Sequence, residues 1–378
     1  MPAERKIKVL IVDDAASMRI FLRKTLESAG DIEVIGTAQD PLEAIELLKT
    51  HTPDVMTLDV EMPNMDGLTF LEKIMRLKPL PVVMVSTLTA RGSQMAIKAL
   101  ELGAVDVVGK PTSAAKDLEP AALQIIQKVR EAACARVGRR AAPTGLVQQI
   151  AKATAASPNT QRIDTLIPTP IKAPVGRPPL IAIGASTGGT EALRQVLAPL
   201  PTNLPPIVIV QHMPAGFTTH FAARLNGHCA IEVSEAVDGE PLKSGHAYIA
   251  PGDLHIRIDW QGSNYVARIL DTERINRHRP SADVLLRSTA SAAGAAAIGI
   301  ILTGMGDDGA RGLLDVRNCG GQTMAQDEAT CVVYGMPRVA KDMGAVMNML
   351  PLQTIPQEII RLSQELKTAL PDKKTGIG

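Results

Sequence analysis

The chain has 378 residues, of which 45% are hydrophobic, so it is long enough to form two domains that each bury a core. Its formal net charge is +1 and its aromatic content is 2%, which argues against nucleic-acid binding, because that function needs a concentrated basic face or base-stacking side chains. The four cysteines form no Cys-x-x-Cys pair, so neither a disulfide framework nor a thiolate zinc site is expected, and a reducing cytoplasm fits best. Residues 1–8 are polar and lack the layout of a signal peptide, and no apolar stretch is long enough to span a bilayer.

Short β-rich runs alternate with amphipathic helical patterns in the first part of the chain. The expected strands are Lys8–Val12, Glu33–Thr37, Val55–Leu58, Val82–Val85 and Asp106–Val108. Helical patterns lie between them, for example at Ser17–Ser28 and Pro41–Lys49. Repeated βα units of this size predict a doubly wound parallel sheet, and residues 1–130 are expected to form one domain.

The composition changes at residues 131–178, where Ala, Pro, Thr and Gln dominate. This composition predicts an extended, semi-flexible linker with a partly helical portion at residues 134–156. Residues 179–378 return to alternating strand and helix patterns, which predict a second α/β domain. Its expected elements are the strands Leu180–Ile183, Ile207–Val210, Ala247–Ile249 and Ala297–Leu302, the helices Thr190–Leu197 and Ala282–Ala293, and a hairpin of Ile256–Ile258 with Tyr265–Ile269.

Polar side chains stand at the ends of the strands predicted in the first domain. Asp13 and Asp14 follow the first strand, Asp59 the third, Ser86 the fourth and Lys110 the fifth. Because ligands bind outside the carboxyl ends of parallel strands, these side chains are expected to share one rim. Clustered carboxylates repel one another unless a cation joins them, which indicates a Mg²⁺ site where one aspartate attacks a phosphoryl group. Each acid alone could instead cap a helix, but that interpretation fits the whole set poorly.

These motifs resemble the receiver domain of bacterial two-component response regulators over about residues 6–129. The resembling segments are Ile11-Val12-Asp13-Asp14, Leu58-Asp59, Met62-Pro63-Asn64-Met65-Asp66-Gly67, Ser86 and Lys110-Pro111. The resemblance implies that Asp59 accepts phosphate from a histidine kinase. It also implies that Lys110 pairs with the phosphate and that Ser86 turns toward it as a switch.

The same resemblance implies a metal site in this domain. Mg²⁺ would be held by Asp14, Asp59 and the backbone carbonyl of Glu61, with Asp13 assisting through water. Gly67 is expected to supply a special backbone angle in the turn after the phosphorylated strand.

A serine lies on a predicted strand-to-helix turn at the start of the second domain, in Gly184-Ala185-Ser186-Thr187-Gly188-Gly189. The Gly-x-Ser-x-Gly spacing exposes a serine hydroxyl on a sharp turn, and the helix behind it offers free backbone N–H groups to a developing negative charge. Two other interpretations compete. The turn could bind a dinucleotide phosphate, although Ser186 would obstruct the pyrophosphate and Gln211-His212 stands at the ribose position, or it could be purely structural.

A histidine and two acids follow other predicted strands of the same domain. His212 comes after the second strand, and Asp307 and Asp308 come after the fourth. Parallel strands would bring Ser186, His212 and Asp308 to one rim, where a hydroxyl nucleophile needs a base and the base needs an orienting carboxylate. The order Ser…His…Asp differs from that of α/β-hydrolases, so another scaffold is expected. His278, in a basic loop, is expected either to line a substrate cleft or to begin a solvated helix.

The second domain resembles, over about residues 179–365, the catalytic domain of the chemotaxis protein-glutamate methylesterases of the CheB type. The resembling segments are Gly184–Gly189, Gln211–Pro214, Ile249–Asp253, Arg279–Ser281, Leu302–Gly309, Ala325–Glu328 and Gly335–Pro337. The resemblance implies hydrolysis of γ-glutamyl methyl esters on chemoreceptors with release of methanol, and deamidation of certain receptor glutamines. By family position Ser186 is the nucleophile, His212 the base and Asp308 its orienter, with Met305 stabilising the oxyanion through its backbone N–H and Thr187 supporting it.

Together the two resemblances imply a flavodoxin-like receiver and a Rossmann-like methylesterase domain joined by the linker. Asp307 stands where many members carry asparagine, so this chain has two adjacent acids, and the choice of Asp308 over Asp307 rests on the family position. The esterase is expected to need no cofactor.

The domain order predicts a phosphorylation-controlled enzyme. The unphosphorylated receiver would hinder access to the Ser186 rim, and phosphorylation of Asp59 would release it. Methylated chemoreceptors and a chemotaxis-type histidine kinase are the expected partners, without nucleic acid or membrane insertion.

A DNA-binding output is one alternative, but such modules are small helical units with a basic recognition helix. A non-enzymatic receptor adaptor is the other, and the three predicted catalytic residues argue against it.

Overall fold

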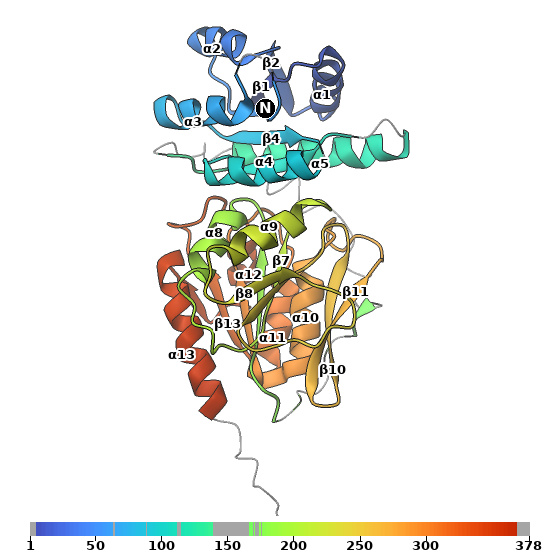
Figure 1. Ribbon diagram of the computed structural model, residues 1–378, viewed down its shortest axis with the longest axis vertical. Coiled ribbons are helices and arrows are strands. Elements are labelled where there is room, and N and C mark those ends of the chain that lie inside the picture. The colour runs from blue at the N-terminus through green and yellow to red at the C-terminus, as the bar shows by residue number, and fades with distance from the viewer. Residues whose placement is uncertain are drawn as a thin grey trace, which may run out of the picture. The chain divides into compact units, whose positions relative to one another are not determined.

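The computed structural model describes residues 5–62, 65–87, 89–111, 115–138, 166–168, 170, 174 and 176–368. The chain divides near Ala156 into two compact units. Figure 1 shows both as α/β units, with blue to cyan elements in the first and green to red elements in the second. No helix among the described residues is both long and apolar enough to cross a membrane.

The first unit contains a five-stranded parallel sheet in the order β2-β1-β3-β4-β5. Its elements are β1 (Ile7–Val12), α1 (Ala16–Ser28), β2 (Ile32–Ala38), α2 (Pro41–Thr50), β3 (Val55–Asp59), α3 (Gly67–Leu77), β4 (Val82–Ser86), α4 (Ala90–Glu101), β5 (Asp106–Gly109) and α5 (Ala115–Ala133). This strand order is the flavodoxin-like one, so the predicted fold class of the first domain is confirmed.

Local sequence explains where the helices of this unit begin. The carboxylate of Asp40 accepts hydrogen bonds from two N–H groups in the first turn of α2, and Pro41 stands at the first helical position. Asp66 and Thr89 cap α3 and α4 through their side chains in the same way. Strands β3 and β4 are buried along their whole length, as expected for a parallel sheet covered on both faces.

The second unit contains a seven-stranded parallel sheet in the order β14-β13-β12-β6-β7-β9-β8, and a two-stranded sheet of β10 and β11. Its helices and strands are β6 (Leu180–Ala185), α8 (Gly189–Leu197), β7 (Ile207–Gln211), α9 (Phe217–Asn226), β8 (Glu232–Glu235), β9 (His246–Ile249), β10 (His255–Gln261), β11 (Asn264–Leu270), α10 (Ala282–Ala293), η2 (Gly294–Ala296), β12 (Ala297–Ile301), α11 (Ala310–Asn318), β13 (Gln322–Gln326), α12 (Met336–Asp342), β14 (Asn348–Leu350), η3 (Leu352–Thr354) and α13 (Ile355–Thr368). The chain order reverses at β6, the first strand, which lies between β12 and β7. Crevices at such reversals are the usual ligand sites of doubly wound sheets, so the strand ends of β12, β6 and β7 are where a site is expected.

The predicted hairpin is present as β10 and β11, which pair in antiparallel register from His255 opposite Leu270 to Gln261 opposite Asn264. The sequence did not predict β8, β13 and β14. These strands are short and mix polar with apolar residues, so they lack the continuous apolar run that marks the inner strands. Strand β13 pairs with β12, β14 pairs with β13, and β8 pairs with β9, so these strands gain their conformation by pairing at the two sides of the sheet.

The described part of the predicted linker contacts the second unit. Helix α5 extends beyond residue 130 to Ala133, and residues 134–138 form no helix. Residues 139–165 lie outside the described residues. Ile167 is buried against Ile275 and Val284, and the guanidinium of Arg177 lies 4.0 Å from the ring centroid of Trp260. This end of the linker is therefore anchored on the second unit.

Candidate active site and phosphorylation site

Ser186 lies at the end of β6, where the chain turns into α8. The turn uses Gly188, whose φ of 76° lies in the left-handed region that favours glycine. Ser186 is 1% exposed, and its Oγ atom has no hydrogen-bond partner among the described residues. A buried, unpaired hydroxyl next to the N-terminus of a helix is available for chemistry rather than committed to structure.

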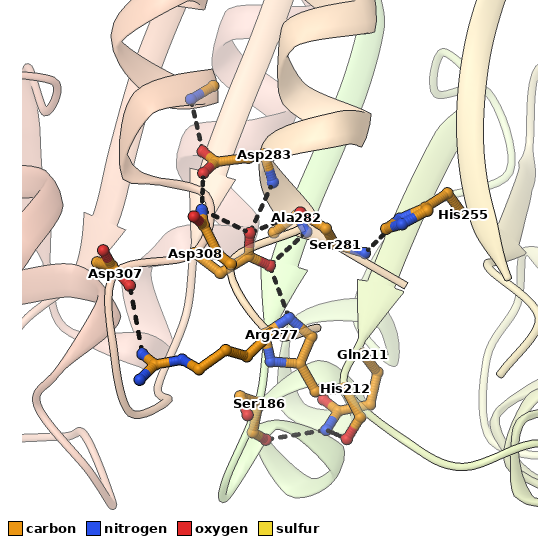
Figure 2. A network of polar contacts seen from close by, with 12 residues as sticks. Ser186, Gln211, His212, His255, Arg277, Ser281, Ala282, Asp283, Asp307 and Asp308 are labelled. Carbon is orange, nitrogen blue, oxygen red and sulfur yellow. Dashed lines mark hydrogen bonds and ion pairs between the residues drawn. The ribbon is translucent and has the colours of Figure 1, made fainter. Parts of the chain in front are cut away.

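His212 directly follows β7, which pairs with β6 so that Ala185 lies opposite Gln211. The backbone N–H of His212 donates to the Ala185 carbonyl at 3.1 Å, and the Gln211 side-chain amide donates to the Ser186 carbonyl at 2.9 Å. These contacts fix Ser186 and His212 as neighbours on adjacent strand ends (Figure 2). The Nδ1 atom of His212 is buried and has no hydrogen-bond partner in the described part of the chain.

Asp308 lies in the loop between β12 and α11, and its Oδ2 atom is 2.8 Å from Nε2 of His212 (Figure 2). The carboxylate is fully buried. It also accepts hydrogen bonds from Ser281 Oγ at 2.6 Å, from the Ala282 N–H at 2.6 Å and from the Asp283 N–H at 3.3 Å. The last two donors belong to the first turn of α10, so Asp308 caps a helix that lies elsewhere in the sequence.

Burial alone would raise the pKa of Asp308, but the hydrogen bond and charge of His212, the charge of His278 and the Ser281 hydroxyl together hold that pKa below its ordinary value. Asp308 is therefore ionised and able to orient an imidazole. The neighbouring Asp307 is exposed, with its carboxylate 4.0 Å from Arg277. Of the two adjacent acids, Asp308 is thus the one that contacts His212.

Of the two residues predicted to support the oxyanion, Thr187 directly follows Ser186 in the chain, and Met305 follows Gly304, which closely approaches Ser186. The Met305 N–H makes no hydrogen bond to any described residue, which leaves it available to a substrate oxygen. The Thr187 carbonyl accepts a hydrogen bond from Thr303 Oγ1 at 3.0 Å, which ties the Ser186 turn to the loop after β12. Gly304 permits this approach, because a Cβ there would lie 2.7 Å from Cβ of Ser186.

Three further residues lie around the site: His278, for which two roles were expected, and His255 and Gln211, for which the sequence predicted no role in the site. The ring of His278 stacks on His212 with centroids 3.8 Å apart and planes 7° apart, so this histidine lines the site rather than beginning a solvated helix. His255 accepts a hydrogen bond from the Ser281 N–H through Nδ1 at 3.2 Å, and burial lowers its pKa to about 4. Gln211 was noted only as part of a motif, although its side chain holds the Ser186 carbonyl. The sequence signal that could have pointed to Gln211 and His255 is their position beside the end of a predicted strand.

The first unit gathers acids at the ends of β1 and β3. Carboxylate oxygens of Asp13, Asp14 and Asp59 lie within 4.8 Å of one another. Asp13 and Asp59 are buried, while Asp14 is exposed. Three hard oxygen donors in one partly open group fit Mg²⁺, which prefers a few carboxylates together with water and phosphate oxygens.

Lys110 follows β5 and contacts two of these acids. Its Nζ atom lies 2.7 Å from Oδ2 of Asp59 and 2.9 Å from Oδ2 of Asp13. Burial works to lower the pKa of Lys110, but the hydrogen bonds and charges of Asp59 and Asp13 outweigh it and raise that pKa. Burial raises the pKa of Asp59 despite Lys110. The carboxylate that is predicted to be phosphorylated therefore already has a cation beside it, the ammonium group of Lys110.

The remaining predicted receiver residues lie around this pocket. Ser86 is buried and its Oγ donates to the Gly92 carbonyl at 3.1 Å, so its hydroxyl is bound to the start of α4. Glu61 is exposed, and its backbone N–H lies 3.4 Å from Oδ1 of Asp59. Gly67 does not have the positive φ that the sequence analysis expected, because it begins α3. It is needed for space instead, since a Cβ there would collide with the Asp59 carbonyl. The motif residues Pro63 and Asn64 lie outside the described residues.

Known proteins resemble both units. Residues 181–359 match the family described as CheB methylesterase, and residues 9–122 match the response regulator receiver domain. A protein-glutamate methylesterase/protein-glutamine glutaminase of Burkholderia lata is 51% identical over 361 residues, covering 95% of this chain and 96% of the relative. One from Bordetella parapertussis is 51% identical over 359 residues, covering 94% and 97%. The crystal structure of the Thermotoga maritima CheB methylesterase catalytic domain is 41% identical, covers 49% of this chain and 98% of that chain, and has a TM-score of 0.48.

The fold and the site thus define a response-regulator receiver followed by an α/β domain of the hydrolase type. Half of the positions are identical to those of relatives along nearly the whole chain, so the chain belongs to the CheB methylesterase family.

Proposed function

We propose that this protein is a phosphorylation-activated serine esterase of the cytoplasm that hydrolyses glutamate methyl esters on chemoreceptors and deamidates receptor glutamines. The hydrogen bond between His212 and Asp308, beside a buried and unpaired Ser186 hydroxyl, carries the proposal. Relatives named for both activities, which match 95% and 94% of this chain, support it.

The geometry suggests a definite role for each nitrogen of His212. Because Nε2 faces Asp308, Nδ1 is the atom free to take the proton of Ser186 Oγ. The deprotonated oxygen attacks the ester carbonyl carbon, and the negative charge that develops on the carbonyl oxygen is stabilised by N–H groups, of which Met305 supplies one. The imidazolium then protonates the departing methoxide, and methanol leaves an acyl-enzyme.

The second half of the reaction returns the enzyme to its starting state. His212 takes a proton from water, the hydroxide attacks the acyl carbon, and the proton passes to Ser186 Oγ as the glutamate carboxylate leaves. A glutamine amide follows the same steps with ammonia as the leaving group. Neither route needs a cofactor in this domain.

Phosphorylation would occur at Asp59, with Mg²⁺ held by Asp59, Asp14 and the Glu61 carbonyl, and with Asp13 assisting through water. The metal would supply charge neutralisation for the incoming phosphoryl group. Lys110 is placed to remain beside the phosphate, since it already contacts Asp59. Ser86 would leave Gly92 and turn toward the phosphate, which makes it the switch. A chemotaxis-type histidine kinase is the proposed phosphodonor.

Methanol release from methylated receptor membranes tests the proposal. The full chain should release methanol faster after a small phosphodonor and Mg²⁺ are added. Ser186→Ala should release none while keeping the wild-type circular dichroism spectrum, and Ser263→Ala, at an exposed turn, should behave as wild type. Asp59→Asn should keep the basal rate and lose the stimulation. Undiminished release by Ser186→Ala would refute the esterase assignment.

A further inference from the structure

The start of α10 holds a second buried carboxylate that the proposed mechanism does not use. Asp283 is fully buried in the first turn of the helix. One of its oxygens accepts a hydrogen bond from the Gly312 N–H at 2.7 Å, and the other accepts one from the Asn276 side-chain amide. Gly312 belongs to the first turn of α11, so Asp283 binds one of the N–H groups that a helix leaves unpaired at its start.

Asp308 therefore caps α10, the helix that contains Asp283, and Asp283 caps α11, the helix that follows Asp308. Asp308 stands just before α11 and accepts N–H groups at the start of α10, whereas Asp283 stands at the start of α10 and accepts an N–H group at the start of α11. The N-terminus of a helix carries a partial positive charge, so each carboxylate meets a favourable field. The two helices approach so closely here that a Cβ on Gly312 would lie 2.8 Å from the Asp283 carbonyl.

Asn276 joins the two carboxylates. Its side-chain amide contacts Asp283 and also lies 3.4 Å from Oδ1 of Asp308. Asn276 has a φ of 47° and the next residue, Arg277, has a φ of 69°, so the loop is held in an uncommon backbone conformation. Such backbone strain persists only where the surrounding contacts impose it. The contacts of Asn276 are with Asp283 and with Asp308, the carboxylate of the site.

We propose that Asp283 and Asn276 are positioning residues for the esterase reaction, which hold the Asp308 carboxylate in line with His212 by the reciprocal capping of α10 and α11. This inference rests on the proposed function of the same site. It explains why a second buried acid stands beside Asp308 without contacting His212 in the described structure.

Charge supports the assignment. Burial raises the pKa of Asp283, and the charge of Asp308 raises it further, while Asp307 adds to the effect and Arg287 opposes it. Asp308 receives donors from His212, Ser281 and the helix, so it keeps the negative charge. Asparagine keeps the shape of this side chain and the oxygen that accepts from the Gly312 N–H, but it replaces the oxygen that faces the Asn276 amide with a donor.

The test compares Asp283→Ala, Asp283→Asn and Asn276→Gly in the full chain. The glycine variant removes the bridging amide and keeps the positive φ. Misplacing a catalytic group by about 1 Å costs on the order of 100-fold in rate, so Asp283→Ala and Asn276→Gly should lower kcat about 10- to 100-fold with KM changed less than about threefold. Asp283→Asn, which can keep the bond from Gly312 and loses the one from Asn276, should lower kcat less than Asp283→Ala does.

Asp315→Ala is the matched control, because Asp315 is an acid of α11 that also joins α10, through Arg287 at 2.6 Å. It should reduce stability and leave kcat within about threefold of wild type. Equal losses of kcat in Asp315→Ala and Asp283→Ala would mean a general structural role and would overturn the proposal, as would a wild-type kcat in soluble Asp283→Ala or in Asn276→Gly. A loss in Asp283→Asn as large as in the alanine variant would also contradict it.

A second readout separates this proposal from the proposed function. The rate at which a fluorophosphonate labels Ser186, followed by mass spectrometry, needs the relay but no receptor. The variants should slow labelling in the same order as they slow methanol release. If the wild-type chain released no methanol, the proposed substrate would be wrong, and the order of labelling rates would still decide whether Asp283 and Asn276 position the relay.

Discussion

At the scale of single residues, the site depends on two atoms without hydrogen-bond partners among the described residues and on one carboxylate that accepts several hydrogen bonds. Ser186 Oγ and His212 Nδ1 are buried without partners among the described residues, whereas Asp308 accepts donors from a histidine, a serine and a helix. Strand ends and residue types sufficed to predict that these three side chains share one rim. The donors around Asp308 come from a loop and a helix remote in sequence, so no local pattern pointed to them.

Replacing Asp308 with asparagine should reduce kcat about 10⁴-fold, as loss of the orienting carboxylate does in serine proteases.

The same Asp308→Asn variant should change how the free energy of unfolding depends on pH. The folded pKa of Asp308 is lowered, so its ionised form stabilises the fold above the unfolded pKa near 3.9. This contribution is lost as the pH falls through the lower, folded pKa. Urea unfolding at a series of pH values should therefore show a shallower acid decline in Asp308→Asn than in wild type.

Gly304 is expected to tolerate no side chain. In Gly304→Ala the new Cβ would meet Cβ of Ser186 and Sδ of Met336, so we expect a loss of about 1–3 kcal/mol in the free energy of unfolding together with displacement of Ser186. Methanol release and urea titration measure the two effects. Gly227→Ala is the control, since its Cβ would find only ordinary contacts, at 3.4 Å or more. Equal behaviour of the two variants would contradict this account of the loop.

At the scale of elements, the inner strands could be predicted because each is a continuous apolar run bounded by turn residues. The strands β8, β13 and β14 could not, since their conformation comes from pairing and not from their own pattern. The same limit applies to Gly67, whose role depends on the distance to a backbone carbonyl and not on its own φ.

Helix α5 is fixed to β5 by a buried cluster of charges. Lys128 Nζ lies 2.8 Å from Asp106 Oδ2 and 3.0 Å from Glu131 Oε2, and the charges of these acids raise its pKa against the effect of burial. Lys128→Met would remove the ammonium that these two buried acids share, so we expect the receiver to lose about 3–5 kcal/mol. Hydrogen exchange of α5 amides measures this. Lys49→Ala, which breaks an exposed pair with Glu46, should cost under about 0.5 kcal/mol.

At the scale of the whole molecule, the family places a phosphate-accepting unit in front of a hydrolase. The sequence predicted this order from two sets of strand-end residues, together with an extended linker. Composition could not predict that the end of the linker packs against the second unit. The few apolar residues of the linker find their partners only once the second unit has folded.

The anchored end of the linker should contribute measurably to the stability of the catalytic unit. Ile167→Ala removes a side chain buried against Ile275 and Val284, so we expect a loss of about 2–4 kcal/mol in the free energy of unfolding. Trp260, the single tryptophan, lies in β10 and reports unfolding of this unit by fluorescence. Leu123→Ala, at an exposed position of α5, should leave that transition unchanged.

The most direct test of the relay is to locate a fluorophosphonate adduct by peptide mass spectrometry in the full chain. The account predicts one adduct, on Ser186, formed at least about 100-fold more slowly when His212 is replaced by alanine. An adduct on another serine, or undiminished labelling of Ser186 in His212→Ala, would contradict it.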